Sequence, residues 1–273
     1  MIRLYIYILL LLLSCLSYVF YEISWKNTEH QELILNAICA ALFGSIGILF
    51  NYFSTNWGAV TLVLKCLYNR NDSIYVSLSY LFKIKIAGEN KYLMIKGSKL
   101  KHQYQPIGGV YKKYNSLTEK WLKWGALEAK NDRNNGDDLR FYVKRKYIPE
   151  IREWFYKRKN REIDVWREFC EELIVPKILD ANIFNHIKPE FLYSKEEALI
   201  QRKGIKTKQF LIYDIYNVNF SKVQEEAILS LYQKGEITEQ YAFVDEENLD
   251  KELFTINNQE YQLGSHAKYL KNE

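Results

Sequence analysis

REFCEE, residues 167–172, is the stretch on which the interpretation of this 273-residue chain depends. On an α-helix its glutamates, Glu168, Glu171 and Glu172, stand at positions i, i+3 and i+4, so their carboxylates share one face. Three like charges at this spacing repel one another and destabilise an isolated helix. Oxygen ligands at this density suit Mg²⁺ or a similar hard cation, but a solvated acidic stripe on an amphipathic helix has the same pattern. The hexapeptide alone leaves both interpretations open.

The residues around this stretch favour a buried helix that ends at a proline. Positions 165, 166, 169, 173 and 174 are apolar, and they form the face opposite the glutamates. Pro176 stops the pattern because proline cannot continue a helix. We therefore predict a helix over residues 161–175 with one buried face and one acidic face.

Upstream, strand patterns surround a pair of glycines. Residues 104–111 (YQPIGGVY) have strand character on both sides of Pro106 and of Gly108-Gly109. Residues 74–86 and 91–96 alternate in hydrophobicity around a Gly-Glu-Asn turn, which predicts a hairpin. The later segments predict a strand over 209–218, a helix over 221–234, and a short strand with an acidic turn over 242–252. This order of strands and helices predicts an α+β domain.

A glycine pair at the end of a strand, followed by an R-E-x-x-E-E helix, resembles the signature of the Nudix hydrolases. The resemblance implies a Nudix-like α/β/α sandwich with a mixed sheet over residues 74–273. It implies that Glu168, Glu171 and Glu172 bind Mg²⁺ or Mn²⁺, that Gly109 lends its backbone to the metal site, and that Arg167 orients a glutamate. In that family the metal activates water against a phosphoanhydride, since a divalent cation lowers the pKa of bound water. Arg167 and the three glutamates are thus the expected catalytic residues.

A long segment interrupts this signature. Gly109 and Arg167 are 58 positions apart, where the usual motif has a short spacer. The glutamate expected eight residues before the arginine falls on Lys159, and the glycine expected after the glutamate pair falls on Ile174. We therefore expect an insertion at about 112–160, with the metal-binding half of the motif intact and its loop half rebuilt.

The whole arrangement resembles a narrower group, the SMODS-associated Nudix domains that follow two transmembrane helices. The pieces that carry this resemblance are VSLSYLFKIKIAGENKYLMIKG (76–97), QYQPIGGVYK (103–112) and REFCEELI (167–174). The resemblance implies an effector of a cyclic-oligonucleotide-based antiphage signalling system (CBASS). Such an effector is activated by a cyclic nucleotide signal and leads to death or arrest of the infected cell.

Two outputs of such an effector stay open from the sequence. The intact glutamates favour Mg-dependent hydrolysis of a nucleoside phosphoanhydride. Small residues in the second apolar helix favour a non-catalytic receptor, whose helices assemble in the membrane when a cyclic oligonucleotide binds. A third alternative is an anchored housekeeping Nudix hydrolase, which fits less well because clearing nucleotides gains nothing from an anchor.

Two apolar runs predict a transmembrane hairpin over residues 1–53, with helices at about 4–21 and 33–53. Each run has the ~20 residues that a helix needs to cross the hydrocarbon core, so the lipid bilayer is an expected partner. Lys26 is the firm cation of the intervening loop, whereas Arg3, Lys65 and Arg70 flank the other ends of the runs. Short loops rich in Lys and Arg stay in the cytoplasm. We therefore expect a multi-pass protein of the cell inner membrane, with its N-terminus and soluble domain cytoplasmic and residues 54–73 as a connector.

Each apolar run has a second interpretation. Residues 12–15 (LLSC) resemble a lipoprotein cleavage site, but the apolar run continues past Cys15, which favours a spanning helix. In the second run, small residues allow helix backbones to approach closely. They are Ala37, Ala41 and Ser45, with Ala40, Gly44 and Gly47 close by. This part of the helix packs either on the first helix or on a second chain, which would make a homo-oligomer.

Residues 140–161 form a basic segment with interleaved aromatic residues. It holds nine Lys or Arg residues against two glutamates. Aromatic rings that stack on bases and cations that meet phosphates are typical of nucleotide-binding surfaces. A cyclic oligonucleotide or nucleotide substrate, an anionic lipid surface, or solvent alone would each fit this composition. The residues that we assign to a ligand are Lys144, Arg145, Lys157, Arg158 and Arg161. His102, the histidine nearest the proposed site, is expected to be structural.

Overall fold

The computed structural model describes residues 2–26, 28–97, 103–129, 136–202 and 205–271. His102 lies outside these residues. The chain divides into two compact units, Met1–Tyr68 and Asn69–Glu273. The first unit holds the apolar helices, and the second holds the strands and the REFCEE stretch.

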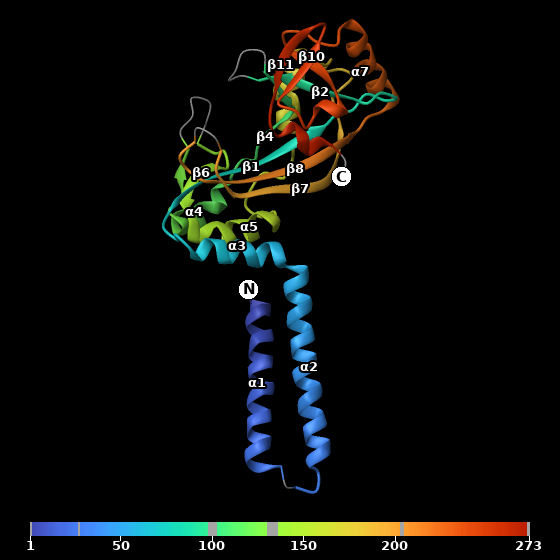
Figure 1. Cartoon of the computed structure of the whole chain (residues 1–273). Coiled ribbons are helices and arrows are strands. Elements are labelled where there is room, and N and C mark those ends of the chain that lie inside the picture. The colour runs from blue at the N-terminus through green and yellow to red at the C-terminus, as the bar shows by residue number, and fades with distance from the viewer. Residues whose placement is uncertain (1, 27, 98–102, 130–135, 203–204, 272–273) are drawn as a thin grey trace. The chain divides into compact units, whose positions relative to one another are not determined.

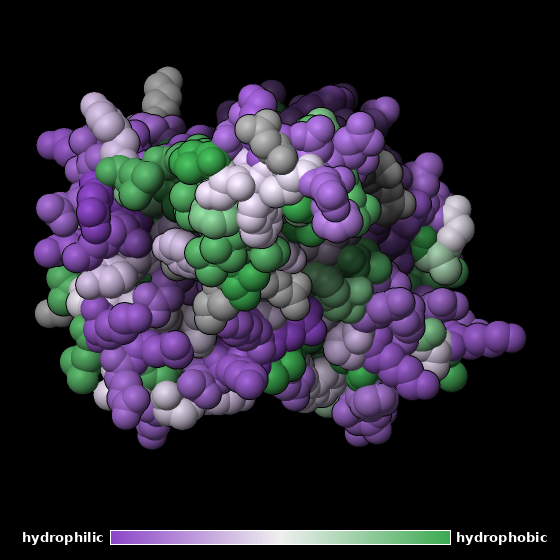
Figure 2. Space-filling model, turned by 90° about the horizontal axis from the view of Figure 1, so that it is seen from below, coloured by the Kyte–Doolittle hydropathy of each residue, from purple (hydrophilic) through white to green (hydrophobic). Residues whose placement is uncertain are grey.

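Two long helices and a short one make up the first unit (Figure 1). Helices α1 (Ile2–Ser24) and α2 (Gln31–Thr55) lie side by side, and both are long and apolar enough to span a membrane. A third helix, α3 (Trp57–Leu67), follows directly. Most described apolar side chains of α1 and α2 are exposed, and Figure 2 shows hydrophobic patches on the face seen from below.

The contact between α1 and α2 is made by one face of each helix. The hydroxyls of Ser14 and Ser45 lie 3.4 Å apart, and each also donates to a carbonyl of its own helix. The rings of Tyr7 and Tyr52 meet edge to face. Of the small residues in α2, Ser45 thus packs on the first helix. A Cβ atom built on Gly44 would meet no atom within 4 Å.

The second unit contains two β-sheets among its described residues. The larger sheet has the order β5-β6-β1-β8-β7, with β4 also paired to β1. Its strands are β1 (Ser73–Lys83), β4 (Gly108–Val110), β5 (Leu127–Glu128), β6 (Arg140–Lys144), β7 (Lys188–Ile200) and β8 (Gln209–Asn219). The smaller sheet has the order β10-β11-β3-β2-β9. Its strands are β2 (Lys91–Lys96), β3 (Gln103–Pro106), β9 (Tyr241–Asp245), β10 (Leu253–Ile256) and β11 (Gln259–Leu263).

Side chains on β1 alternate between two hydrophobic layers, because successive residues of a strand point to opposite faces. On one face Phe82 contacts Phe169 of the REFCEE helix. On the other face Leu81 belongs to a buried cluster with residues of the smaller sheet, such as Met94 and Val244. The larger sheet therefore lies between helices on one face and the smaller sheet on the other. Parallel pairing of β1 with β8 and antiparallel pairing with β6 make it a mixed sheet, which confirms the predicted α+β fold.

The helices of this unit are short. They are α4 (Thr118–Trp124), α5 (Ile148–Tyr156), α6 (Trp166–Phe169) and α7 (Lys222–Lys234), with 3₁₀ turns at η1 (Asn115–Leu117), η2 (Arg145–Tyr147), η4 (Glu246–Asn248) and η5 (Ala267–Leu270). The predicted helix over 221–234 is confirmed as α7, because Ser221 and Gln224 form a capping box at its start. The predicted strand over 209–218 is confirmed as β8.

The predicted hairpin at the start of the domain forms only next to its turn, and its two strands belong to different sheets. β1 and β2 approach each other only near the turn, where Lys85 bridges to Tyr92. Beyond that point β1 pairs in the larger sheet and β2 in the smaller sheet. Local alternation predicted both strands correctly, but their partners come from distant parts of the chain.

The predicted helix over 161–175 is also too long. Arg161 forms a bridge with Lys113, and the helix begins only at Trp166, whose amide donates to the side chain of Asp164 at 2.9 Å. The second half, η3 (Cys170–Ile174), is a π-helix, with the Val175 amide bonded to the carbonyl of Cys170. Such π turns are rare and often occur at functional sites.

Candidate active site

Gly108 is the point at which the chain passes from the smaller sheet into the larger one. β3 ends at Pro106, and β4 begins at Gly108 opposite Leu81 of β1. Gly108 has φ +149°, and a Cβ atom there would overlap the backbone of Tyr80 and Leu81. Only glycine fits a backbone that approaches another strand so closely. This crossing presents the Gly108 amide to the π turn.

Glu172 receives that amide. Its Oε2 atom accepts a hydrogen bond from the Gly108 N–H at 2.7 Å. The pKa of Glu172 is raised to about 8, mainly by burial and in part by the charges of Glu168 and Glu171, whereas this hydrogen bond acts to lower it. The carboxyl group of Glu172 is therefore neutral over much of the physiological pH range as long as no cation lies close to it.

Glu168 lies against the second glycine of the pair. A Cβ atom built on Gly109 would overlap the Glu168 carboxyl group, so an alanine there would displace it. Burial raises the pKa of Glu168, although Arg167 opposes the shift. The Glu171 side chain, by contrast, is 55% exposed.

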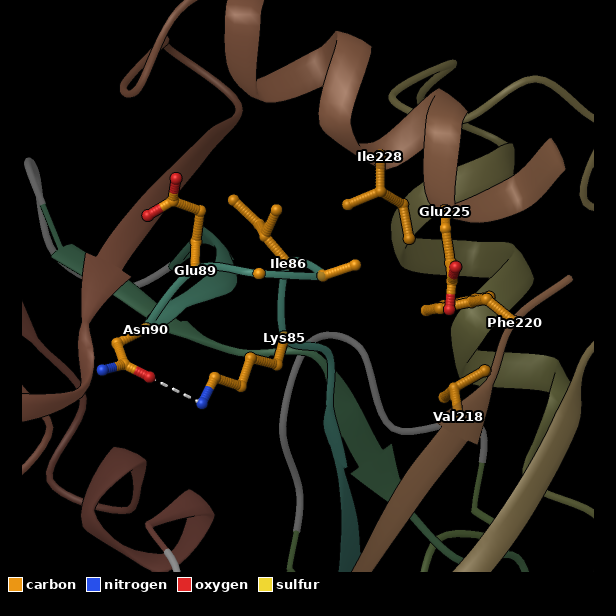
Figure 3. Close-up of a pocket in the computed structure, with 10 residues that line it drawn as sticks. Lys85, Ile86, Glu89, Asn90, Val218, Phe220, Glu225 and Ile228 are labelled. Atoms are coloured by element: carbon orange, nitrogen blue, oxygen red, sulfur yellow. Dashed lines mark hydrogen bonds between the residues drawn. The ribbon is translucent and has the colours of Figure 1, made fainter. Parts of the chain in front are cut away.

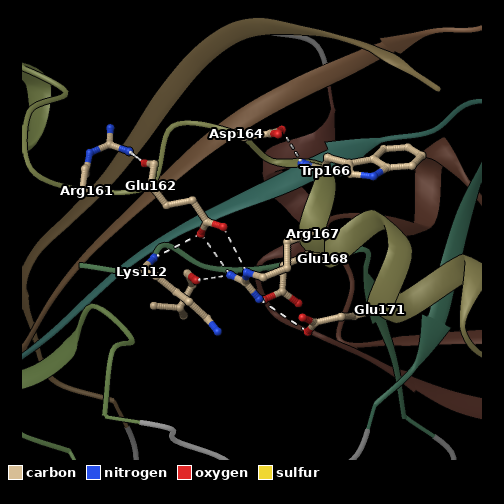
Figure 4. Close-up of polar contacts among 9 residues, drawn as sticks. Lys112, Arg161, Glu162, Asp164, Trp166, Arg167, Glu168 and Glu171 are labelled. Carbon is tan, nitrogen blue, oxygen red and sulfur yellow. Dashed lines mark hydrogen bonds and ion pairs between the residues drawn. The ribbon is translucent and has the colours of Figure 1, made fainter. Parts of the chain in front are cut away.

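Arg167 connects three carboxylates of the site to β4 (Figure 4). Its Nε and Nη2 atoms donate to the two carboxylate oxygens of Glu162, each at 3.0 Å, which makes a bidentate ion pair. Nη2 also donates to the carbonyl of Val110 at 2.9 Å. Nη1 donates to Glu168 and lies 3.4 Å from Glu171 Oε2. One guanidinium group thus ties the helix to β4 and to three carboxylates.

Glu162 is a site residue that was not predicted from the sequence. It lies five positions before Arg167, whereas the motif position that we examined falls on Lys159. Its Oε2 atom also accepts from the amide of Lys112 at 3.1 Å, so both carboxylate oxygens are used. The signal in the sequence is an acidic residue close upstream of the arginine, at a spacing that differs from that of the motif.

Asp138 is a second acidic residue that was not predicted. Its backbone forms an isolated antiparallel β-bridge with Lys112, two residues after the end of β4. Burial raises the pKa of Asp138, and the cations Arg140, Arg167 and Lys112 oppose this shift. Its charge in turn raises the pKa of Glu168. The segment at 112–160 therefore supplies a carboxylate to the surroundings of the site.

The donor chemistry of this site fits a hard divalent cation, because the carboxylates outnumber the nearby guanidinium group and raise one another's pKa. The carboxylates are nevertheless not arranged as the ligands of a metal site. Among the described residues, no group of three or more His, Cys, Asp or Glu side chains is positioned to hold a metal ion. Arg167 stands between Glu168 and Glu171, and Glu172 turns toward Gly108. The predicted residues are thus brought together at the glycine pair, with an arginine as their counter-ion.

The five basic residues assigned to a ligand are not brought together. Arg161 is 2% exposed, and its guanidinium carbon lies 4.2 and 4.0 Å from the ring centres of Tyr111 and Phe155. Arg145 is 3% exposed and lies 3.8 Å from Asp72. These two side chains lie inside the domain, so they do not offer their charge to a ligand on its surface.

The other three basic residues are exposed. They are Lys144, Lys157 and Arg158. Lys157 pairs with Glu153 at 2.8 Å, and the guanidinium carbon of Arg158 lies 4.7 Å from the centre of the Phe191 ring. The basic segment is therefore partly a structural element, α5 with its flanks, and partly an ordinary solvated surface.

A separate cavity of about 500 Å³ lies between the turn after β1 and helix α7 (Figure 3). Apolar side chains such as Ile86, Phe220 and Ile228 line it, and Lys85 donates to Asn90 at its rim. It shares no lining residue with the carboxylate cluster. Glu89 and Glu225 add negative charge, which does not favour a phosphate there.

The second unit matches a family model over most of its length. The SMODS-associated NUDIX domain model matches residues 73–271, which cover the second unit almost from end to end. No curated protein and no solved structure matches the chain. On the family match, this chain belongs to the SMODS-associated NUDIX domain family.

Proposed function

We propose that this protein is a membrane-anchored Nudix-type effector of a CBASS-like antiphage system, which hydrolyses a nucleoside phosphoanhydride. Family membership supports the link to cyclic-oligonucleotide signalling. The observation that carries the enzymatic part is the cluster at the glycine pair, where Arg167 holds Glu168 beside Gly109 and Glu172 accepts the Gly108 amide. A plain acidic stripe on a helix would face solvent and would need no glycine opposite it.

In this proposal, Glu168, Glu171 and Glu172 hold Mg²⁺ or Mn²⁺ together with the backbone of Gly109. The bound metal supplies Lewis-acid chemistry, that is, neutralisation of phosphate charge and a lower pKa of water. The chain itself does the positioning. Glu162 fixes Arg167 through a bidentate pair, and Arg167 then fixes Glu168. The exposed Glu171 reaches the site from the solvent side.

Both α1 and α2 serve as the anchor in this proposal, and the positive residues at their outer flanks favour a cytoplasmic domain. A cytoplasmic location matches the chemistry, because nucleotides and a cyclic-oligonucleotide signal are both found there. The inner membrane of the cell is the expected site.

A receptor that works through its helices is the second candidate, and one feature of α2 favours it. Ser45 faces α1, whereas Gly44 and Gly47 lie away from it and have no atom within 4 Å of an added Cβ. Glycines on an open helix face allow close packing against another helix in lipid. In this alternative the bound signal makes the hairpins assemble into a homo-oligomer and perturb the bilayer.

One experiment separates the two outputs. The full chain, reconstituted in nanodiscs with Mg²⁺, is tested for hydrolysis of a nucleotide panel with and without cyclic di- and trinucleotides. The parent protein and the single-residue variants named below are also tested for killing of cells that express the cyclic-oligonucleotide synthase. We expect Glu168→Gln and Glu172→Gln to abolish both hydrolysis and killing, and the exposed Glu119→Gln on α4 to change neither.

The opposite pattern supports the receptor. If Glu172→Gln leaves killing intact while Gly44→Leu abolishes it, hydrolysis is not the output. Ile46→Leu is the matched control, because Ile46 is an exposed apolar residue of the same helix. A Cβ atom at position 44 has no atom of its own chain within 4 Å, so an effect of the larger side chain is expected to report on contacts with another chain.

A further inference from the structure

We propose that α3 is an interfacial helix, whose exposed apolar stripe lies in the headgroup region of the bilayer. The proposal rests on the anchoring of α1 and α2, and it adds a lipid contact outside the two spans. The stripe is formed by Trp57, Leu64 and Tyr68, which are 61%, 57% and 74% exposed. Trp57, Thr61 and Leu64 stand at i, i+4 and i+7 and share one face of the helix, and Tyr68 follows at i+11 as the residue that caps its end.

The two faces of α3 are distinct. Leu62 and Cys66, on the face opposite the stripe, are each 3% exposed and therefore buried. Thr61 is the polar member of the stripe, and its hydroxyl donates to the carbonyl of Trp57 at 2.9 Å within the helix. Because of that bond, the hydroxyl proton of Thr61 does not need water as its acceptor. The stripe can therefore enter a partly apolar environment without losing a hydrogen bond.

The position of α3 in the chain indicates what covers this stripe. α2 ends at Thr55, and Asn56 closes its last turn through two bonds to the carbonyl of Tyr52, from its backbone N–H and its side-chain amide. The chain then turns, and Figure 1 shows α3 running across the end of α2. A helix that starts two residues after a candidate membrane span begins close to the membrane surface, so its exposed stripe is within reach of the lipid headgroups.

The composition of α3 also favours lipid over protein. Trp and Tyr at the two ends of the stripe are the residues enriched at membrane–water interfaces. Residues 54–71 contain Lys65 and Arg70 but no Asp or Glu, so the charge around α3 attracts anionic headgroups. An eleven-residue helix is ~16 Å long, which is short for a stable protein interface. We therefore commit to the bilayer, and a second copy of the chain is an outcome of the test.

Quenching of tryptophan fluorescence by brominated lipids measures this contact in the intact chain. The full-length protein is reconstituted in liposomes of phosphatidylglycerol and phosphatidylcholine with bromines near the top of the acyl chains. Trp25→Phe removes the other tryptophan of the first unit, and Trp25→Phe/Trp57→Phe gives the baseline of the four tryptophans in the domain. We expect the quenched fraction to fall to near zero when Trp57 is removed. Equal quenching with and without Trp57 overturns the proposal.

A nitroxide at position 64 gives an independent measurement. Leu64→Cys is labelled in a chain whose four native cysteines are replaced by alanine, and Glu119→Cys on α4 serves as the water-exposed control. We expect a several-fold higher ratio of oxygen to nickel-chelate accessibility at position 64 than at 119. Spin–spin broadening at position 64 would assign the stripe to a second copy, and an accessibility ratio like that of the control would assign it to water. Either result overturns the proposal.

Flotation of the liposomes tests the anchoring of α1 and α2 separately from the lipid contact of α3. A protein that does not float with the vesicles refutes the anchoring of α1 and α2, and with it the contact of α3. A protein that floats but whose Trp57 is not quenched refutes the interfacial helix alone. The quenching arm retains all four cysteines, so it is decisive even if the replacement of the buried Cys66 prevents folding.

Discussion

Arg161 and Arg167 are only six residues apart, but they stand at the centres of two different charge networks. Arg161 is buried between two aromatic rings, with Asp214 at 3.8 Å as its acidic partner. Arg167 is partly exposed and faces Glu162, Glu168 and Glu171. The first network is balanced and closed, whereas the second carries an excess of negative charge. An excess of this kind is costly for the fold alone and suits a site that receives a cation.

The largest effect that tests this contrast is expected for Arg161→Ala. Asp214 would remain buried and lose its cation, and breaking a buried pair costs about 3–5 kcal/mol. Thermal unfolding of the detergent-solubilised chain measures this loss. Lys159→Ala removes an exposed charge two residues away and serves as the control. Unchanged stability of the Arg161 variant would show that its network is not structural.

Glu162→Gln is expected to affect activity more than stability. The substitution breaks the bidentate pair that fixes Arg167, and the loss of such a supporting group typically costs 10–100-fold in metal affinity or activity. Mg²⁺ titration by calorimetry and the hydrolysis assay measure the two quantities. A large drop in melting temperature, with metal affinity retained, would place Glu162 in the structural class beside Arg161.

The pH dependence of stability sharpens the comparison further. Glu172 has a pKa of about 8 in the folded chain against 4.5 as its ordinary value, so the folded state binds the extra proton between these pH values. Its contribution to stability is therefore complete below pH ~4.5 and is lost as the pH rises through ~8. Without divalent cations, we expect Glu172→Gln to be more stable than the parent at pH 9 and similar to it at pH 5. Melting curves with and without Mg²⁺ test this, and a pH-independent difference contradicts it.

The smallest effect is expected for Lys157→Ala. Its pair with Glu153 is an exposed i,i+4 pair, and such pairs contribute about 0.3–0.5 kcal/mol. Neither hydrolysis nor Mg²⁺ affinity should change. If this variant instead loses affinity for a cyclic oligonucleotide, the exposed part of the basic segment is a ligand surface after all.

Local patterns in the sequence predicted many of the elements but fewer of their partners. Alternation identified β1, β2 and β8, and the serine before Lys222 identified the start of α7. β7 was missed because Lys188–Ile200 is an edge strand with several charged residues, which hide its alternation. The separation of β1 and β2 into two sheets was not predictable, because each strand has one partner, β8 for β1 and β9 for β2, that lies more than a hundred residues away.

The candidate site was predictable to the extent that it is encoded in contiguous residues. The motif gave the glycine pair, Arg167 and the three glutamates. Glu162 was missed because its spacing from Arg167 differs from that of the motif, and Asp138 because only folding brings it near Glu168. The assignment of Arg145 and Arg161 to a ligand rested on net charge, and composition does not distinguish a buried cation from an exposed one.

One edge of β1 is occupied by two strands in succession. Residues 79–81 pair with β4, and residues 73–77 pair with β6 from the long segment. Excising residues 112–160 would therefore not leave a simpler domain of the same fold. It would expose a row of backbone amides and carbonyls along β1, a template on which other chains can pair and aggregate. Residues 112–160, which lengthen the motif, thus cover the edge of the strand that also pairs with the glycine pair. The insertion and the glycine pair therefore depend on each other.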